Sequence, residues 1–164
     1  MKALVLYDSK FGNTEKIAQA IGAALAPKGD VAVARVSDAR REHLAGVSLL
    51  VVGSPTWGGR PTPAINQWLK NLPSHGLEGV KVAAFDTRGD MSQVTSRFVH
   101  WLVGIVGFAA APISARMKKK GGTVAVAPEG FIVLDREGPL KDGELERAAE
   151  WASSIAHAAK ALVL

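Results

Sequence analysis

Apolar residues are concentrated in five short runs along the chain, with helical or loop-like stretches between them. The runs cover residues 3–7, 31–36, 49–53, 80–87 and 123–127. They are rich in Val, Ala and Leu and do not alternate with polar residues, which is typical of strands buried on both faces of a parallel sheet. The pattern therefore predicts five buried, parallel strands.

Between the strands, apolar residues recur at the spacing of amphipathic helices. The first set is Ile17, Ala18, Ile21 and Leu25, and the second is Ile65, Trp68, Leu69 and Leu72. The last helix carries the clearest apolar stripe, over residues 145–159, and Asp142 is expected to cap it. This alternation predicts a three-layer α/β fold with right-handed crossovers. At 164 residues, the chain 1–164 is expected to form a single domain.

The composition narrows the class of protein. Hydrophobic residues make up 48% of the chain and charged residues 21%, as in soluble globular proteins. Cysteine is absent, which excludes disulfides and a catalytic thiol, and the four histidines are scattered, so we expect no metal site. The five-residue apolar run before Asp8 is shorter than the roughly 7–15 residues of a signal peptide. We therefore expect a cytoplasmic protein.

A net charge of +5 brings nucleic acids and anionic membranes into consideration as partners. The densest basic run is Lys118, Lys119 and Lys120, and Gly121 follows it directly. Lysines before a glycine are typical of a helix C-terminus, where cations complement the helix dipole and glycine adopts a left-handed cap. We therefore interpret the run as a helix end and expect no nucleic acid.

Ligands of parallel α/β sheets bind beyond the carboxyl ends of the strands, which directs attention to residues 8–14, to 54–63 and to the residues from 86 onward. The first of these loops reads DSKFGNT and enters a predicted helix. Hydroxyl, amide and lysine side chains before a helix N-terminus favour an anion such as phosphate. The alternative is that Ser9, Asn13 and Thr14 only cap the helix.

Three competing motifs are missing from the chain. GxxxxGK[ST] would indicate a nucleoside triphosphate loop, GxGxxG after a strand a dinucleotide site, and GxSxG an α/β-hydrolase. A single phosphate is therefore the anion that the first loop favours.

The segment from Leu4 to Ile21 resembles the signature of the flavodoxin family: an apolar strand, a hydroxyl residue, a small residue, a threonine, and then Ala and an apolar residue. The resemblance implies a doubly wound, five-stranded parallel sheet of order 2-1-3-4-5, with FMN at the point where the strand order reverses. It also implies that the first loop holds the FMN phosphate. The residues concerned are Ser9, Lys10, Phe11, Gly12, Asn13 and Thr14.

In flavodoxins the second loop places an aromatic ring against one face of the flavin. The matching residues here are Pro55, Thr56, Trp57 and Gly58. Trp57 is the expected stacking residue, since a flat apolar ring suits a flat apolar ligand. Gly58 is expected to let the peptide beside the flavin turn over when the flavin is reduced. The alternative is a tryptophan packed under its own loop.

The third loop departs from the family, because it lacks the tyrosine that flavodoxins commonly place on the other flavin face. Asp86 and Thr87 are expected to contact the ribityl or pyrimidine end through backbone groups, and Arg88 to approach the flavin edge. The alternative is a charged loop without ligand contacts. With Arg60 and Arg88 in place of the acidic rim of flavodoxins, the resemblance implies a less negative potential for the second reduction step.

Residues 98–115, FVHWLVGIVGFAAAPISA, form an uncharged stretch that is slightly shorter than the roughly 20 residues needed to span a bilayer. Gly104, Gly107 and Pro112 interrupt it, so we expect no transmembrane segment. A buried helix before the fifth strand is the main expectation. An exposed flap over the flavin, a dimer contact and a surface that meets a membrane quinone are the alternatives, and Trp101 is a candidate for the second flavin face.

No side chain stands out as an acid, base or nucleophile, so we name no catalytic residue. The sequence thus favours an FMN-binding electron carrier that works between redox partner proteins, and the basic balance predicts acidic partners. Two alternatives remain: an FMN-dependent oxidoreductase of the quinone or protoporphyrinogen type on the same fold, and a flavin-free binding module.

Overall fold

A parallel sheet forms the middle layer of the structure, a computed structural model that describes residues 1–161 and their side chains other than that of Val106. The last residues of the expected domain, 162–164, lie outside the described residues. The strands are β1 (Lys2–Tyr7), β2 (Asp30–Arg35), β3 (Leu49–Pro55), β4 (Lys81–Gly89), β5 (Thr123–Val124) and β6 (Glu129–Val133). All pairings among these strands are parallel, in the order β2-β1-β3-β4-β5. The predicted order 2-1-3-4-5 is therefore confirmed.

The last strand differs from the prediction, because two short strands take the place of one. The run 123–127 was expected to form a continuous strand, but β5 ends at Val124 and the chain pairs with β4 again only from Glu129. The register shows that residues 125–128 lie opposite residues 83–84 of β4. Pro128 has no amide hydrogen to donate to the sheet, which favours an interruption at this edge position.

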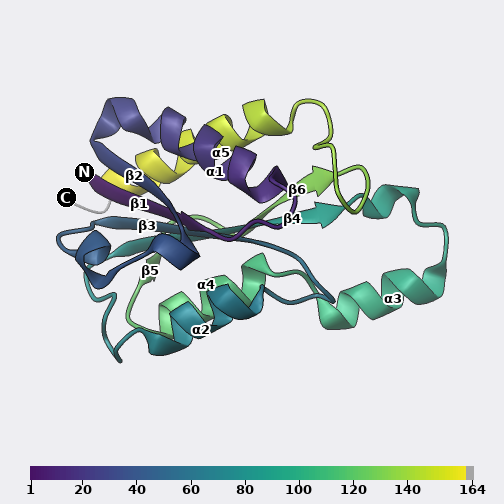
Figure 1. The fold of residues 1–164 in the computed structure, drawn as a ribbon, viewed down its shortest axis with the longest axis horizontal. Helices are drawn as coiled ribbons and strands as arrows, with labels where there is room; N and C mark the ends of the chain where they lie inside the picture. Colours follow the sequence, from purple (N-terminus) through teal and green to yellow (C-terminus); the bar gives the residue numbers. More distant parts are fainter. Residues whose placement is uncertain (162–164) are drawn as a thin grey trace.

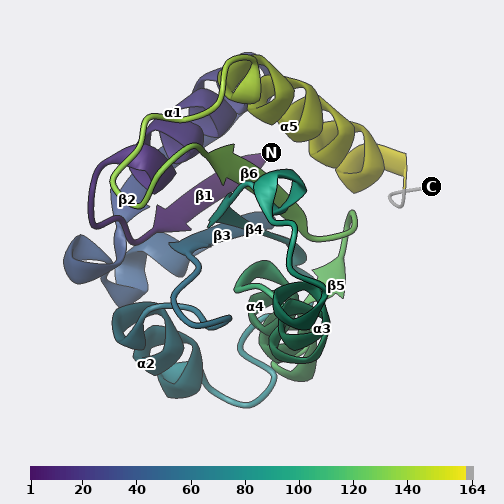
Figure 2. The same cartoon turned by 90° about the vertical axis from the view of Figure 1, so that its right-hand side faces the viewer.

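Within residues 1–161, five α-helices cover the two faces of the sheet or extend beyond it. They are α1 (Asn13–Leu25), α2 (Pro63–Asn71), α3 (Arg97–Val106), α4 (Ala110–Lys119) and α5 (Glu144–Ala161). Short 3-10 turns are η1 (Ala26–Lys28), η2 (Val36–Asp38), η3 (Arg41–Leu44) and η4 (Met91–Gln93). Figure 1 and Figure 2 show α1 and α5 on one face of the sheet and α2 and α4 on the other, so the predicted three-layer architecture is confirmed.

Successive side chains along each strand point to opposite faces of the sheet, so each face has its own hydrophobic core. In β1, Val5 packs in the core under α1 and α5, whereas the adjacent Leu4 packs in the core over α2 and α4. Phe85, Phe131 and Trp151 form an aromatic cluster in the first core, with edge-to-face ring pairs 6.1–6.2 Å apart. A Cβ at Gly53 would lie 2.0 Å from the Phe85 ring, so this strand position requires glycine.

The ends of two helices test the predicted caps. After α4, Gly121 has φ +97° and its amide donates to the Lys118 carbonyl, while the Gly122 amide donates to Met117. These contacts form a Schellman motif, which confirms the lysine run as a helix C-terminus. The prediction that Asp142 caps the N-terminus of α5 was wrong. The α5 helix begins after Gly143, whose carbonyl accepts from the Arg147 amide, since a glycine with φ +87° makes the turn into the helix.

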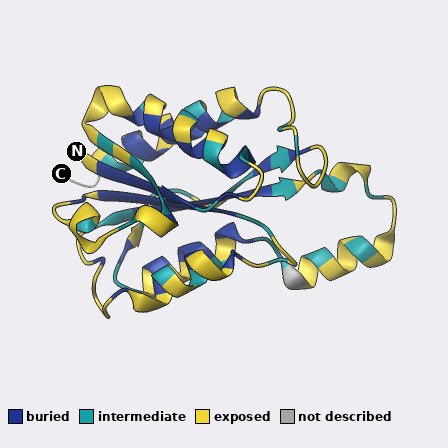
Figure 3. Ribbon diagram, viewed as in Figure 1, coloured by how far each residue is buried: buried dark blue, intermediate teal, exposed yellow. Residues whose placement is uncertain are grey.

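The apolar segment 98–115 forms two helices with different surroundings, so the expected buried helix before the fifth strand is found only in the second part, α4, and the expectation was wrong for α3. Gly107, with φ +73°, ends α3, and α4 starts three residues later. The α4 helix buries Ile113 and Met117 against the sheet. The α3 helix extends beyond the carboxyl edge of the sheet and is largely exposed, as Figure 3 shows. The reason is geometric, since no strand reaches far enough to cover α3.

Candidate functional site

A cavity of about 670 Å³ lies at the carboxyl ends of β1, β3, β4 and β6. Its walls come from four segments that are far apart in sequence. The lining residues are Ser9, Lys10, Phe11, Asn13, Thr14, Pro55, Thr56, Trp57, Gly58, Thr87, Arg88, Gly89, Asp90, Met91, Val94, Val133, Leu134, Asp135 and Arg136. The structure thus brings the three predicted loops together. Of the predicted site residues, Gly12 and Asp86 do not line the cavity.

The first loop presents free backbone amides to the cavity. Gly12 is left-handed, with φ +88°, and its amide donates to the Ser9 hydroxyl over 3.1 Å. No side chain caps α1. Among residues 1–161, no protein group accepts a hydrogen bond from the amides of Asn13, Thr14 and Glu15. Unpaired amides at a helix N-terminus, together with the helix dipole, favour an anion at this position.

Arg35 supports this loop from the neighbouring strand, a contribution that the sequence analysis missed. Its Nη2 atom donates to the Ser9 carbonyl over 2.6 Å, and its guanidinium lies 5.9 Å from the centre of the Tyr7 ring. Burial raises the pKa of the Tyr7 hydroxyl, and the nearby Glu15 adds to this effect, so the ring carries no charge at neutral pH. The position of Arg35 in the sequence could have predicted this contact, because Arg35 ends β2 and is in register with Tyr7 at the end of β1.

Side-chain contacts hold the cavity walls together. The hydroxyls of Thr14 and Thr87 are 2.8 Å apart, which joins the first loop to β4, and both residues are buried. The side-chain amide of Asn13 donates through Nδ2 to the Glu137 carbonyl over 3.0 Å and so fixes the segment after β6. At least one amide hydrogen of Asn13 is therefore used within the protein. The expected role of this side chain toward phosphate is shared with a structural one.

The second loop forms a tight hairpin that exposes an indole ring. Trp57 and Arg60 exchange backbone hydrogen bonds of 2.9 and 3.0 Å, and the two glycines between them have φ +52° and +76°. These values correspond to a type I′ turn, which strongly favours glycine at both positions. Trp57 is 44% exposed, so it is not packed under its own loop. The Lys10 ammonium lies 4.0 Å from the centre of the indole ring, a cation–π distance.

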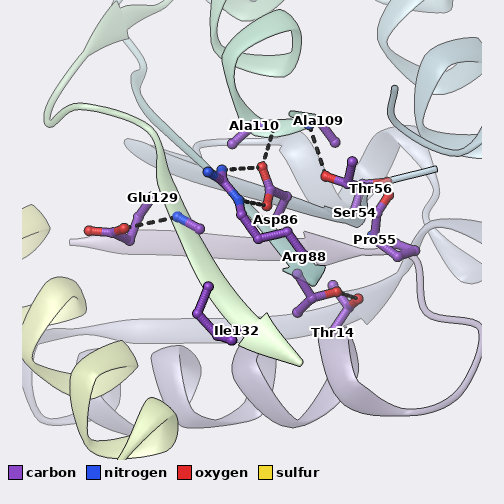
Figure 4. Close-up of polar contacts among 12 residues, drawn as sticks. Thr14, Ser54, Pro55, Thr56, Asp86, Arg88, Ala109, Ala110, Glu129 and Ile132 are labelled. Carbon is purple, nitrogen blue, oxygen red and sulfur yellow. Dashed lines mark hydrogen bonds and ion pairs between the residues drawn. The ribbon is translucent and has the colours of Figure 1, made fainter. Parts of the chain in front are cut away.

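A buried ion pair supports the third loop, as Figure 4 shows. The Asp86 carboxylate is fully buried and accepts from Nε and Nη2 of Arg88, both at 2.7 Å. It also accepts from the Ala110 amide at the start of α4, over 2.9 Å. The Arg88 guanidinium lies 3.7 Å from the centre of the Phe108 ring. Asp86 therefore positions Arg88 and α4, and Arg88 forms part of the cavity wall.

Comparisons with known proteins agree with this architecture. The family model described as flavodoxin matches residues 5–151. The chain belongs to the flavodoxin family. A flavodoxin from the domain Archaea is similar at 25% identity, with a TM-score of 0.76 and coverage of 98% of this chain and 99% of that chain. Oxidised flavodoxin 2 from Bacillus cereus is similar at 24% identity, with a TM-score of 0.73 and coverage of 96% and 99%.

The flavodoxin fold also matches part of a larger protein. The rubredoxin oxygen:oxidoreductase from Desulfovibrio gigas has 21% identity and a TM-score of 0.68, and the match covers 98% of this chain but 36% of that one. The likeness in this case shows the fold alone. Membership of the flavodoxin family makes the chain an FMN-type electron-transfer flavoprotein and implies a flavin cofactor. The resemblance seen in the first loop is therefore confirmed.

The cavity of this flavodoxin fits such a cofactor. Its volume is that of a typical small-molecule site, which spans about 300–1,000 Å³. Free amides on one wall suit a phosphate, and the exposed Trp57 ring on another suits a flat aromatic ligand. Within residues 1–161, no group of three or more His, Asp or Glu side chains is arranged to hold a metal ion.

Two parts of the wall were missed by the sequence analysis. Met91 and Val94, in and after η4, add apolar surface, and residues 133–136 close the side beneath β6. The second group could have been found if the strand over 129–133 had been predicted, because its carboxyl end lies beside that of β4. Trp101, the candidate for the second flavin face, is 60% exposed and does not line the cavity.

Proposed function

We propose that the cavity binds FMN and that the chain carries electrons between redox partner proteins. The observation that supports this best is that Asn13 and Thr14, whose backbone amides have no partner among residues 1–161, line the same cavity as the exposed Trp57 ring. A phosphate site beside an aromatic platform matches the two ends of a flavin mononucleotide. The bound flavin supplies the redox chemistry, and the protein supplies binding, orientation and electrostatics.

The phosphate end is assigned to the first loop. The amides of Asn13, Thr14 and Glu15 donate to the phosphate, and the hydroxyls of Ser9 and Thr14 add donors. Lys10 and Arg35 contribute positive charge from two sides of the loop. The Thr14 to Thr87 hydrogen bond keeps these donors fixed relative to β4, which reduces the ordering cost of binding.

The ring end is assigned to the second and third loops. Trp57 stacks on one face of the ring, while Thr87 and Arg88 lie toward its other end. The ion pair with Asp86 holds the Arg88 guanidinium in a single orientation. Gly58 has φ +52°, and because glycine adopts positive and negative φ about equally readily, the peptide beside the flavin can turn over at little cost.

Partner docking is assigned to the mouth of this cavity. Lys10 forms no ion pair with any carboxylate among residues 1–161, whereas the exposed pair of Asp90 and Lys141 is neutralised. A basic chain with an unpaired lysine at the mouth favours acidic partner proteins, and their docking should weaken as salt rises. The absence of cysteine is consistent with a cytoplasmic carrier formed by one domain over 1–164.

The test compares FMN with riboflavin, which lacks the phosphate. Calorimetry on the apoprotein should show FMN binding about a hundredfold tighter than riboflavin, because hydrogen bonds to a charged group contribute about 1.5–3 kcal/mol each. Replacing Trp57 by Ala should weaken both ligands about equally. Equal affinity for the two ligands would contradict the phosphate assignment, and no uptake of either would leave the flavin-free binding module as the better description.

A second candidate is an FMN-dependent oxidoreductase that reduces a quinone-type acceptor. It is favoured by one observation, the apolar surface that Met91, Val94 and the adjoining α3 helix provide beside the cavity mouth. A carrier exchanges electrons with proteins, whereas the enzyme would turn over a quinone. Steady-state assays with NADPH and a soluble quinone separate the two, since sustained turnover supports the enzyme.

A further inference from the structure

The α3 helix exposes an apolar stripe that nothing in the described chain covers. Phe98, Trp101 and Ile105 are 64%, 60% and 64% exposed, and Leu102 is 38% exposed. Their spacing places them on one side of the helix. The rings of Phe98 and Trp101 stack with their centres 5.9 Å apart. A contiguous exposed apolar patch of this kind marks an interaction surface.

Capping contacts show that α3 is a formed helix even though it projects from the sheet. The Ser96 hydroxyl accepts from the Val99 amide at the N-terminus. At the other end, the Gly107 amide donates to the Val103 carbonyl. The His100 ring bonds to the Val94 carbonyl, which ties α3 to the segment that lines the cavity. The stripe therefore has a fixed place beside the cavity mouth.

The chain segment that contains α3 and α4 carries only basic charges, although Asp90 and Asp135 line the adjoining cavity. No Asp or Glu occurs in residues 91–128, and α2, α3 and α4 together contain none. The basic residues of these three helices are Lys70, Arg97, Arg116, Lys118 and Lys119. The helices on the other face, α1 and α5, carry acidic residues as well as basic ones. Figure 1 and Figure 2 place α3 beyond the end of the layer where α4 begins, whereas the basic residues of α2 and α4 lie in the last turns of those helices, so Arg97 is the basic residue next to the stripe.

We propose that α3 docks this protein on an anionic lipid bilayer. Aromatic and aliphatic side chains on one side of a helix, with basic residues nearby, are the composition of helices that lie in the membrane interface. Trp and Phe favour that region. Basic residues without neighbouring acids add attraction to anionic headgroups. The docked helix places the mouth of the cavity next to the lipid surface.

The helix lies on the bilayer and does not span it. Residues 97–119 are long and apolar enough to cross a membrane by length and composition, and an 18-residue stretch within them has a mean hydropathy of 1.7. The chain breaks at Gly107, however, and α4 is committed to the core through Ile113 and Met117. The ten residues of α3 measure only about 15 Å, half the roughly 30 Å of the hydrocarbon core.

A second copy of the chain is a weaker candidate for the occupant. A buried aromatic side chain contributes about 150–250 Å², so the exposed parts of the four side chains amount to roughly 500 Å². A standard protein interface buries about 800 Å² on each partner. In addition, pairing two α3 helices would bring together two segments that carry Arg97 and no acidic residue, which opposes association.

The experiment is vesicle co-sedimentation of the full chain, without FMN, so its result does not depend on the proposed function. Vesicles of equal parts phosphatidylcholine and phosphatidylglycerol should bind the protein, and pure phosphatidylcholine should bind it less. Replacing both Phe98 and Trp101 by Ser should lower the partition coefficient about a hundredfold, because two large apolar side chains lose their burial. The matched control is Leu145→Ser on α5, an exposed leucine distant from α3, which should bind like the wild type.

Charge is tested with a second matched pair. Arg97→Glu and Arg41→Glu change the net charge equally, but only Arg97 lies on α3. We expect Arg97→Glu to weaken binding to anionic vesicles more than Arg41→Glu. Absence of wild-type binding would overturn the proposal, as would equal binding by the Phe98 and Trp101 double variant. A dimer in solution that this variant converts to a monomer, without vesicle binding, would assign α3 to a second copy. Far-UV circular dichroism confirms that each variant is folded.

Discussion

The helices α3 and α5 both carry an apolar stripe, yet the protein buries only one of them. On α5, Ala148, Ala152 and Ile155 are fully buried and Trp151 is 9% exposed. On α3, the aromatic rings and Ile105 face outward. The small alanines let α5 approach α1 and the sheet closely, whereas α3 lies beyond the carboxyl ends of the strands. An apolar stripe thus predicts a helix, but its burial depends on whether an opposite surface exists.

The two stripes therefore have different roles: the α5 stripe stabilises the fold, and the α3 stripe is available for an interaction. Burial of the α5 stripe stabilises the fold, because it removes apolar area from water within the chain. The α3 stripe contributes little to folding and is available to another surface. Substitutions at equivalent residue types on the two helices should therefore have very different consequences.

The largest effect is expected from matched tryptophan substitutions. Trp151→Ala should lower the free energy of unfolding by about 3–5 kcal/mol, since it leaves a cavity beside Phe85 and Phe131. Trp101→Ala should change it by no more than about 0.5 kcal/mol. Urea unfolding followed by circular dichroism measures both values. Similar losses of unfolding free energy in the two variants would show that α3 is packed in solution and would contradict the proposed difference between α3 and α5.

A second test concerns α4, the helix that follows α3 and does reach the sheet. Asp86→Asn should lower the free energy of unfolding by about 2–3 kcal/mol, because the Arg88 guanidinium loses a buried ionic partner and the Ala110 amide a charged acceptor. The same urea titration measures this loss. Asp38→Asn, at an exposed carboxylate in η2, is the control and should have no effect. An equally stable Asp86→Asn protein would show that the ion pair does not anchor α4.

The start of α5 provides a pH-dependent test. Burial raises the pKa of Glu144, but hydrogen bonds from Arg147 and from the Ile132 amide outweigh burial, and the net pKa lies below the ordinary value of 4.5. Its contribution to stability is therefore present above about pH 4.5 and is lost as the pH falls through the lower folded-state pKa.

Replacing this residue, Glu144→Gln, should lower the free energy of unfolding by about 1–2 kcal/mol at neutral pH. The difference from the wild type should shrink as the pH falls below 4.5, since the wild-type carboxylate then becomes protonated. Urea titrations at a series of pH values check this. A difference that stays constant with pH would contradict the role of the charge.

The smallest effect is expected at the cavity mouth, between the two helical layers. In the FMN-loaded protein, Lys10→Gln should make the potential of the second reduction step more negative. A single exchange of charge at a solvated rim is worth about 1 kcal/mol, or roughly 40 mV for one electron. Redox titration measures it, and Arg41→Gln, on the exposed η3 turn, serves as the control. An unchanged potential would assign the lysine only to its contact with Trp57.

The structure changes which residue is expected to matter for this potential. The sequence pointed to Arg60 and Arg88, but Arg88 is paired with Asp86, so its charge is largely compensated. Arg60 does not line the cavity, whereas Lys10 lines it, lies beside the indole ring and forms no ion pair within residues 1–161. Residues two apart on a strand point to the same face, but the predicted strand ended at residue 87, whereas β4 continues to Gly89 and so places Asp86 and Arg88 side by side.

Much of the fold followed from the chain pattern alone. Runs of Val, Ala and Leu without alternation favour burial on both faces of a parallel sheet between helices, which holds for β1, β3 and β4, whereas the edge strand β2 is partly exposed. The hydroxyl and amide groups before α1, and the Trp57–Gly58 turn after β3, were identified as a site because strand ends meet at one edge. These features are local, or follow from general rules of sheet topology, so they could be predicted.

Only the tertiary structure decided the remaining features. The interrupted edge strand depends on how residues 125–128 fit against two residues of β4, and the wall at 133–136 follows from that fit. The support that Arg35 and Asp86 give to the loops depends on contacts between separate strands and helices. The exposure of α3 depends on where the sheet ends. The amino-acid pattern determines which segments are apolar, whereas the surfaces that meet them are determined by how distant parts of the chain pack together.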